Sequence, residues 1–263
     1  MRIVVFLRHK NPNTIIQLKM KRTFLAIMVV AAGLMMTACF NNSSNNNNPN
    51  DNGNKKNEVT PVQPEGKVVA DPSGIDAIRK TWAKGPFDLD KGDIDPDIET
   101  FAFAICKKFP TCKTNKAMMD YLMDPKGYNN EEYKIESSPR NGYIHCMRQV
   151  QTTPITDVCF WNRKNGNKLV AAYMEDTHES GEWAERLVVF YDYDPATDVM
   201  TPEPALTKMI ENRIKSFDTY AVVLPKEGKD IKVIGYVIDE ENDSADAVNL
   251  QLKWDGNTFD WVN

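Results

Sequence analysis

GNKLVAAYMEDTHESGEWAERLVVFYDYDPATDVM, residues 166–200, consists of a glycine turn, two apolar segments joined by an acidic hairpin tip, and a Thr-containing turn before a final apolar pair. Residues 228–262, GKDIKVIGYVIDEENDSADAVNLQLKWDGNTFDWV, repeat this order about 62 residues later. Each copy predicts consecutive strands with short connections, which favour antiparallel pairing. The likeness suggests an internal duplication; the alternative is that any two antiparallel hairpins of similar length look alike.

The chain around these two copies continues the same strand pattern, and we expect four strands on each side of a helix over 201–215. The expected strands lie near residues 142–150, 155–163, 167–175, 185–193, 217–224, 230–238, 247–255 and 258–262. The sequence therefore predicts an α+β fold in which antiparallel sheets form two four-strand meanders, each with helix cover.

Three further helices are expected within residues 71–124. The first covers about 71–83 and the third 115–123. For the second, we expect Asp95 as the N-cap and Pro96 at the first helical position, with apolar residues at helical spacing up to Phe109.

A secretory signal precedes this part of the chain. Starting at Met20, two basic residues are followed by an apolar run from Phe24 to Met36, two small residues and Cys39. This is the order of regions in a signal peptide, and the run is shorter than the roughly 20 residues that a membrane span needs. We expect residues 1–38 to be a leader and signal peptide, with Met20 as the true start.

Met36-Thr37-Ala38-Cys39 resembles the lipobox of bacterial lipoproteins. The resemblance implies that Cys39 receives a diacylglycerol on its sulfur, becomes the first residue after cleavage, and is acylated on its amine. Two or three acyl chains, such as palmitate, give a stable membrane anchor. Together with the Asn-rich segment that follows and the phrases LPKEGKDI and LKWDGNTFDWV, the lipobox makes the chain similar to lipoproteins of uncharacterised families common in Bacteroidales. That resemblance implies the outer membrane, and the lack of an acidic tag directly after Cys39 favours the face toward the periplasm.

The processed chain is expected to be a tethered acidic domain. Residues 39–66 are rich in Asn, Ser, Pro and charge and predict a disordered tether. Residues 67–263 then form the globular α+β domain, with helices in 71–124, a first meander in 142–201, and a helix with a second meander in 202–263. Residues 1–38 hold six of the 32 basic residues and none of the 37 acidic ones, so the processed chain is more acidic than the precursor. This balance argues against nucleic acid as a partner.

Four cysteines remain besides Cys39: Cys106, Cys112, Cys146 and Cys159. An even number in an exported chain suggests disulfides, for which three connectivities exist. We prefer Cys146 with Cys159, as opposite residues of a hairpin, and Cys106 with Cys112. A metal site is the alternative, but the spacings are not those of Cys-x-x-Cys and His145 is the only nearby histidine.

Few residues suggest chemistry, and we expect no catalytic residues and no cofactor. Asp88, Asp90 and Glu99 occupy positions 1, 3 and 12 of a calcium-binding loop pattern. Gly92 does not fall at the position that the pattern requires, and an acidic loop that caps a helix explains the same residues. Trp183, beside a polar hairpin tip, is a candidate for stacking on a sugar ring.

These features favour a membrane-anchored periplasmic lipoprotein that acts as a non-enzymatic binding or interaction module for an envelope protein or glycan. The first alternative is a glycan-processing enzyme that uses paired carboxylates. The second is a structural protein of the envelope.

Overall fold

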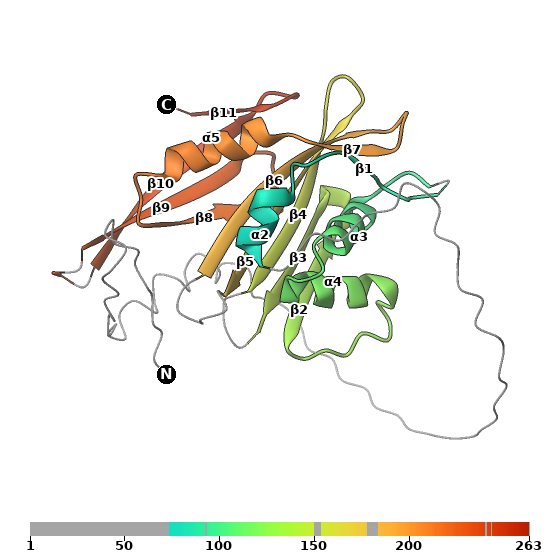
Figure 1. Ribbon diagram of the computed structural model, residues 1–263, viewed down its shortest axis with the longest axis horizontal. Coiled ribbons are helices and arrows are strands. Elements are labelled where there is room, and N and C mark those ends of the chain that lie inside the picture. Colours follow the sequence, from blue (N-terminus) through green and yellow to red (C-terminus); the bar gives the residue numbers. More distant parts are fainter. Residues whose placement is uncertain are drawn as a thin grey trace.

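Two antiparallel sheets carry the fold (Figure 1). The computed structural model describes residues 74–262 apart from 93, 150–153, 178–183, 240 and 243. The expected signal peptide, Cys39 and the tether lie outside the described residues. Sheet A has the strand order β1-β7-β6-β5-β4-β3-β2, and sheet B has the order β11-β10-β9-β8.

The strands of sheet A are β1 (Phe87–Asp88), β2 (Tyr133–Ser138), β3 (Tyr143–Arg148), β4 (Ile155–Asn162), β5 (Lys168–Thr177), β6 (Ala184–Asp194) and β7 (Val199–Pro202). Those of sheet B are β8 (Thr219–Val223), β9 (Ile231–Asp239), β10 (Ser244–Trp254) and β11 (Phe259–Trp261). The helices are α2 (Ile75–Thr81), α3 (Ile98–Lys108), α4 (Lys113–Met123) and α5 (Pro204–Ile214), with a 3-10 turn at Pro139–Asn141.

The predicted α+β class and antiparallel sheets are confirmed, and all eight predicted strands are present. The predicted size of the first sheet is wrong, because β1, β2 and β7 join its four central strands. β1 and β7 are too short to show a period of two residues in the sequence. In β2 only Tyr133 is buried, and the strand has no apolar run that would identify it in the sequence.

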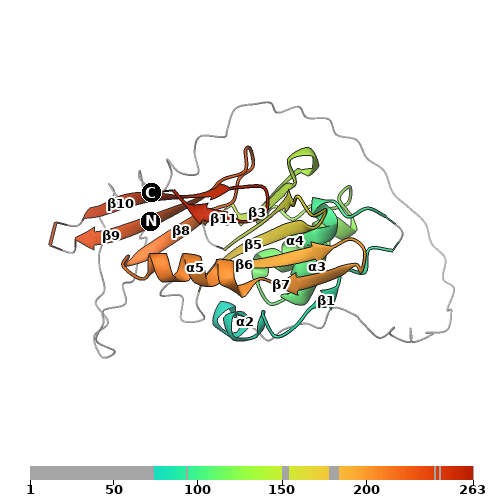
Figure 2. The same ribbon diagram turned by 90° about the horizontal axis from the view of Figure 1, so that it is seen from above.

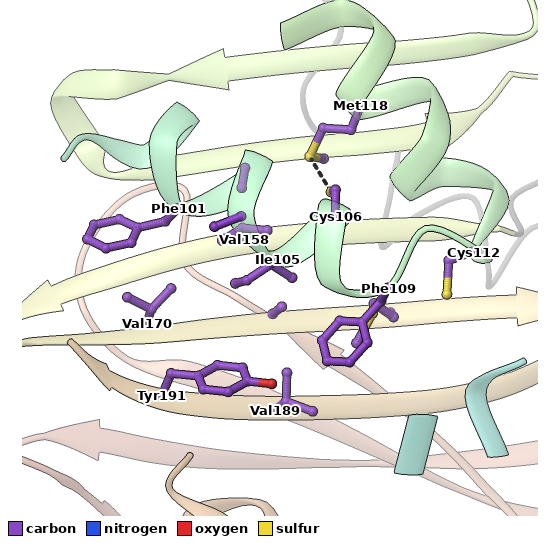
Figure 3. Close-up of a cluster of buried hydrophobic side chains, with 14 of the residues drawn as sticks. Phe101, Ile105, Cys106, Phe109, Cys112, Met118, Val158, Val170, Val189 and Tyr191 are labelled. Atoms are coloured by element: carbon purple, nitrogen blue, oxygen red, sulfur yellow. Dashed lines mark hydrogen bonds between the residues drawn. The ribbon is translucent and has the colours of Figure 1, made fainter. Parts of the chain in front are cut away.

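One face of sheet A is covered by three helices. α3 and α4 pack on β2–β4, and α2 packs on β5 and β6 (Figure 1). Figure 3 shows how the apolar side of α3 reaches the sheet. The residues of this core include Phe101, Ile105, Phe109, Val158, Val170, Val189 and Tyr191.

The opposite face of sheet A packs against α5 and sheet B in a second core. Trp161 of β4 contributes to this core, with its ring centroid 6.0 Å from that of Trp254 and 5.0 Å from that of Phe259. Its indole N–H donates to the carbonyl of Lys229 at 2.8 Å. The molecule thus has three layers, in the order helices, sheet A, and sheet B with α5.

α5 lies beside β6 because β7 pairs only with the C-terminal end of that strand, Tyr191–Asp194. The carbonyls of β6 before that point need other donors. The Thr207 hydroxyl donates to the carbonyl of Val188 at 3.0 Å, and the backbone N–H of Glu203 donates to that of Phe190 at 2.8 Å. α5 thus supplies one donor to the edge that β7 leaves open, and the Tyr220 hydroxyl supplies another, to the carbonyl of Arg186 at 3.2 Å.

The N-cap of α3 is Asp97 and not Asp95 as the sequence suggested. The Asp97 carboxylate accepts from the backbone N–H of Thr100 at 2.9 Å. The helix begins at Ile98, so Pro96 precedes it. Residue 97 is extended, as the residue before a helix must be for its side chain to reach back.

Replacing Asp97 by alanine is therefore expected to lower the free energy of unfolding by about 1 kcal/mol. Asp95→Ala is the matched control, since this exposed carboxylate is not the one that accepts from Thr100, and its effect should stay within about 0.5 kcal/mol. Urea unfolding of the two variants measures the difference. Equal losses would contradict the assignment of Asp97 as the cap.

The four cysteines are buried free thiols, so neither predicted disulfide is present. Cys146 pairs in register with Thr156, and Cys159 pairs with Tyr143. The partner of Cys159 on β3 therefore lies three residues before Cys146. Because this offset is odd, the two cysteines point to opposite faces of the sheet: Cys146 lies in the core under the helices and Cys159 in the core between the sheets.

Cys106 donates instead to the Met118 sulfur, with the two sulfur atoms 3.7 Å apart (Figure 3). Burial raises the pKa of Cys112 and of Cys146 to about 12, so both thiols stay protonated near neutral pH.

Candidate functional site

A line of polar side chains crosses the face of sheet A that is turned toward sheet B. In direct register, Glu136 pairs with His145, His145 with Asp157, and Asp157 with Tyr173. Lys134 lies two residues from Glu136 on β2, so it shares the same face. Glu175 lies two residues from Tyr173 on β5 and pairs with Arg186 of β6, so this pair lies on that face too. We call these residues the polar row: Lys134, Glu136, His145, Asp157, Tyr173, Glu175 and Arg186.

The segment Thr219–Lys226, which contains β8, crosses the strands of sheet A beside the polar row. At one end, the Thr219 hydroxyl accepts from Arg186 at 3.0 Å. At the other end, the Lys226 ammonium donates to Glu136 at 3.0 Å. Between them, the Cys159 thiol donates to the carbonyl of Pro225 at 3.6 Å. The segment that begins with β8 therefore contacts both ends of the polar row.

His145 and Asp157 form the centre of the polar row. The imidazole Nδ1 hydrogen-bonds Asp157 Oδ1, which also accepts from the Tyr143 hydroxyl at 3.2 Å. Burial lowers the pKa of His145, but the charge and hydrogen bond of Asp157, together with the charge of Glu136, outweigh burial and raise the pKa above its usual value. Burial, followed by the Asp157 charge, also raises the pKa of the Tyr143 phenol.

The raised pKa of His145 predicts a pH-dependent contribution to stability. An unfolded histidine has a pKa of about 6.5, so the stabilisation is complete below that pH and is lost as the pH rises through the folded pKa. Titration of His145 by NMR should give a pKa above 6.5 in the wild type. In Asp157→Asn the pKa should fall, because the charge and hydrogen bond that raise it most are removed while burial still lowers it. An unchanged pKa in the variant would contradict the pairing.

Glu136 lies between two ammonium groups, Lys134 Nζ at 2.7 Å and Lys226 Nζ at 3.0 Å. The hydrogen bond from Lys134 is the largest cause that lowers the pKa of Glu136, and Lys226 adds to it against the opposing effect of burial. The resulting pKa is about 2, so this carboxylate is ionised at every physiological pH. Both lysine side chains remain partly exposed.

Glu175 and Arg186 form the most enclosed ion pair of the polar row. Arg186 donates to the two carboxylate oxygens of Glu175 at 3.0 and 3.1 Å. The Tyr173 hydroxyl donates to the same carboxylate at 2.7 Å, and burial raises the pKa of that phenol. The guanidinium is thus held between its own sheet and Thr219 of sheet B.

The residues predicted to bind calcium do not gather in the structure. Asp90 forms an ion pair with Lys107 at 3.7 Å, and Glu99 accepts from Ser137 at 2.8 Å. Within the described ranges, no group of three or more His, Cys, Asp or Glu side chains is placed to hold a metal ion. Trp183, the candidate for sugar stacking, lies outside those ranges.

A second, partly buried charge cluster has a structural role. Arg163, at the end of β4, donates to both carboxylate oxygens of Glu203 at 2.6 and 2.7 Å and to Asp192 at 2.5 Å. Asn167 donates to the second Asp192 oxygen at 2.7 Å. Because Glu203 directly precedes α5, this cluster fixes the start of that helix against sheet A.

Reasoning from the sequence did not find the polar row. Its members are spread over five strands, and only their register brings them together. The alternation of side chains in β3 and β4 could have indicated it. His145 is two residues from Tyr143 and Asp157 is two residues from Cys159, so each shares a face of its strand with that neighbour.

Comparison of the chain with protein-family models, with curated proteins and with solved structures gives no match. No helix of the described part of the chain is long and apolar enough to cross a membrane. The fold and the polar row therefore define the class on their own: an α+β protein of two antiparallel sheets with a line of ion pairs where sheet B borders sheet A.

Proposed function

We propose that the chain is an outer-membrane lipoprotein that acts as a non-enzymatic binding module in the periplasm. Cys39 is its lipidated residue, and residues 39–66 are the tether that carries the domain away from the membrane. The sequence supports the anchor through the lipobox resemblance at Met36-Thr37-Ala38-Cys39 and the apolar run before it.

The polar row beside Thr219–Lys226 is the observation that carries the binding role. Its donors and acceptors are fixed by pairing with one another on a rigid sheet, so little ordering cost arises when a ligand binds. The partly exposed ammonium groups of Lys134 and Lys226 can donate to a ligand while they remain near Glu136. This chemistry suits a ligand with several acceptor oxygens, such as an envelope glycan or an acidic protein segment.

A glycan-processing enzyme is the second candidate, because Glu136 and Asp157 flank His145 on the two neighbouring strands. Their Cα atoms are two strand spacings apart, about 9–10 Å, with both side chains on the same face, and an inverting glycosidase uses such a pair of carboxyl groups. The pKa of Glu136, lowered to about 2 mainly by Lys134, opposes this role. A general acid must hold its proton near neutral pH.

We also propose that the two hairpins arose by duplication within the chain. β6 begins at Ala184 and β10 at Ser244, and each has 11 residues. β7 and β11 begin at Val199 and Phe259. The first residue of each copy, Gly166 and Gly228, has a positive φ, a conformation that glycine adopts most readily.

Crosslinking and pull-down of the full lipoprotein from its own envelope, followed by mass spectrometry of proteins and glycans, tests the binding role. Four forms are compared: the wild type, Cys39→Ala without the anchor, the double variant Lys134→Ala with Lys226→Ala, and Lys208→Ala as a control at an exposed lysine of α5. We expect one partner or glycan to be enriched with the wild type and the control and to be lost from the other two.

Enrichment that survives in the double lysine variant would show that the polar row is not the binding site. Equal enrichment with Cys39→Ala would remove the anchor from the function. If nothing is enriched and deletion of the gene changes the glycan composition of the envelope, the binding role is wrong and the carboxylate enzyme takes its place.

A further inference from the structure

The β9–β10 hairpin extends beyond the rest of the fold (Figure 2). β10 has 11 residues, but β11 pairs only with Leu252–Trp254. The backbone N–H of Val262 adds one bond to the carbonyl of Gln251 at 2.9 Å. Among the described residues, nothing pairs with the same edge of β10 from Ser244 to Leu250.

The unpaired backbone groups on this edge can be identified from the register. The Gln251 carbonyl points toward β11, and backbone groups of a strand point to the same edge at every second residue. The N–H and C=O groups of Ala245, Ala247 and Asn249 therefore point outward, whereas those of the residues between them pair with β9. Such an edge is a template for one more strand.

The side chains beside this edge favour an extended ligand with apolar residues. Val248, which is 39% exposed, lies beside the edge on the face of the hairpin that also carries Asp239 and Asp246, and Val237 of β9 lies one strand further in on that face. On the other face, Ala245 and Ala247 leave room for the side chains of an added strand. In β-strand addition, the backbone bonds supply affinity and neighbouring side-chain contacts supply specificity.

The charge of the hairpin selects among possible occupants. Its described residues between Val233 and Leu250 include the carboxylates of Asp239, Glu241 and Asp246, and no lysine or arginine occurs in this part of the sequence. Two copies that paired through β10 would bring these carboxylates together, which disfavours a dimer. A basic strand would be attracted instead.

We propose that the open edge of β10, Ser244–Leu250, binds an extended basic polypeptide segment as an additional strand. The segment carries lysine or arginine at alternate positions, with side chains on the face of the hairpin that holds Asp246 and Val248, and apolar side chains between them on the face of Ala245 and Ala247. This surface uses none of the polar row, so the binding role of that row and the present proposal can fail separately.

Fluorescence anisotropy with a labelled seven-residue peptide of alternating lysine and valine tests the proposal on the full chain in a non-ionic detergent. Ala247→Pro removes one outward N–H and leaves the β9 ladder intact, because proline is tolerated at strand edges. We expect this change to weaken peptide binding roughly tenfold with an unchanged melting temperature. Asp246→Asn with Glu241→Gln should weaken binding and reduce its salt dependence, whereas Glu227→Gln, an exposed acid outside the hairpin, should not.

Two further peptides complete the design: one with proline at its central position and one with glutamate in place of lysine. Both should bind roughly tenfold more weakly than the parent peptide. Absence of binding by the parent peptide, equal binding by the glutamate peptide, or equal binding to Ala247→Pro would each overturn the proposal. A dimer in size-exclusion chromatography that Ala247→Pro dissociates would overturn it too, because a second copy would then occupy the edge.

Discussion

Replacing Glu175 by alanine is expected to lower the free energy of unfolding by about 3–5 kcal/mol, because it breaks a buried ion pair by removing one partner. Arg186 would lose the carboxylate that it contacts at 3.0 and 3.1 Å, and the Tyr173 hydroxyl would lose its acceptor. Both side chains of the pair are largely buried, so water cannot replace the lost partner easily. Guanidinium chloride unfolding at neutral pH measures the loss.

The double variant Glu175→Leu with Arg186→Met is the control, since it removes both charges and keeps the volume. Replacing a buried ion pair by apolar residues is often neutral or stabilising, so the double variant should recover most of the loss. A loss below about 1 kcal/mol for the single variant would mean that the pair behaves as an exposed salt bridge and that the polar row is open to solvent at this end.

The strands of both hairpins could be predicted because their residues alternate between a buried and an exposed side. In β9, Ile231 and Val233 are buried and Lys232 is exposed, and the sequence carries the same period. β2 was missed for the opposite reason, since its face in the inter-sheet region carries Lys134 and Glu136. A strand whose polar residues serve a site lacks the signal that identifies strands.

The polar row and the faces on which the cysteines lie depend on the register between neighbouring strands, which a single sequence indicates only weakly. The sequence placed Cys146 and Cys159 opposite each other in a hairpin, but the true partners are Thr156 and Tyr143. A register error of an odd number of residues exchanges the two faces of a strand. The register that separates Cys146 from Cys159 also pairs His145 with Asp157. The register of β3 and β4 therefore both corrects the disulfide prediction and brings the polar row together.

Trp161→Ala is expected to lower the free energy of unfolding by about 3–5 kcal/mol, the usual cost of removing a large aromatic side chain from a core. The loss has a specific location here, because Trp161 of sheet A contacts Trp254 and Phe259 of sheet B and bonds to the carbonyl of Lys229. Denaturant unfolding followed by tryptophan fluorescence and by far-UV circular dichroism measures the loss with two probes.

The two probes also show how strongly the sheets depend on each other. If sheet B folds only on sheet A, both signals should shift together and the slope of the transition should not change. Trp161→Phe, which keeps an aromatic ring but loses the N–H, should cost less than the alanine variant. A small loss in Trp161→Ala, with separate transitions for the two probes, would contradict the inter-sheet core. The polar row would then lack the fixed border that sheet B gives it, because Thr219 and Lys226 reach sheet A only while the two sheets stay packed.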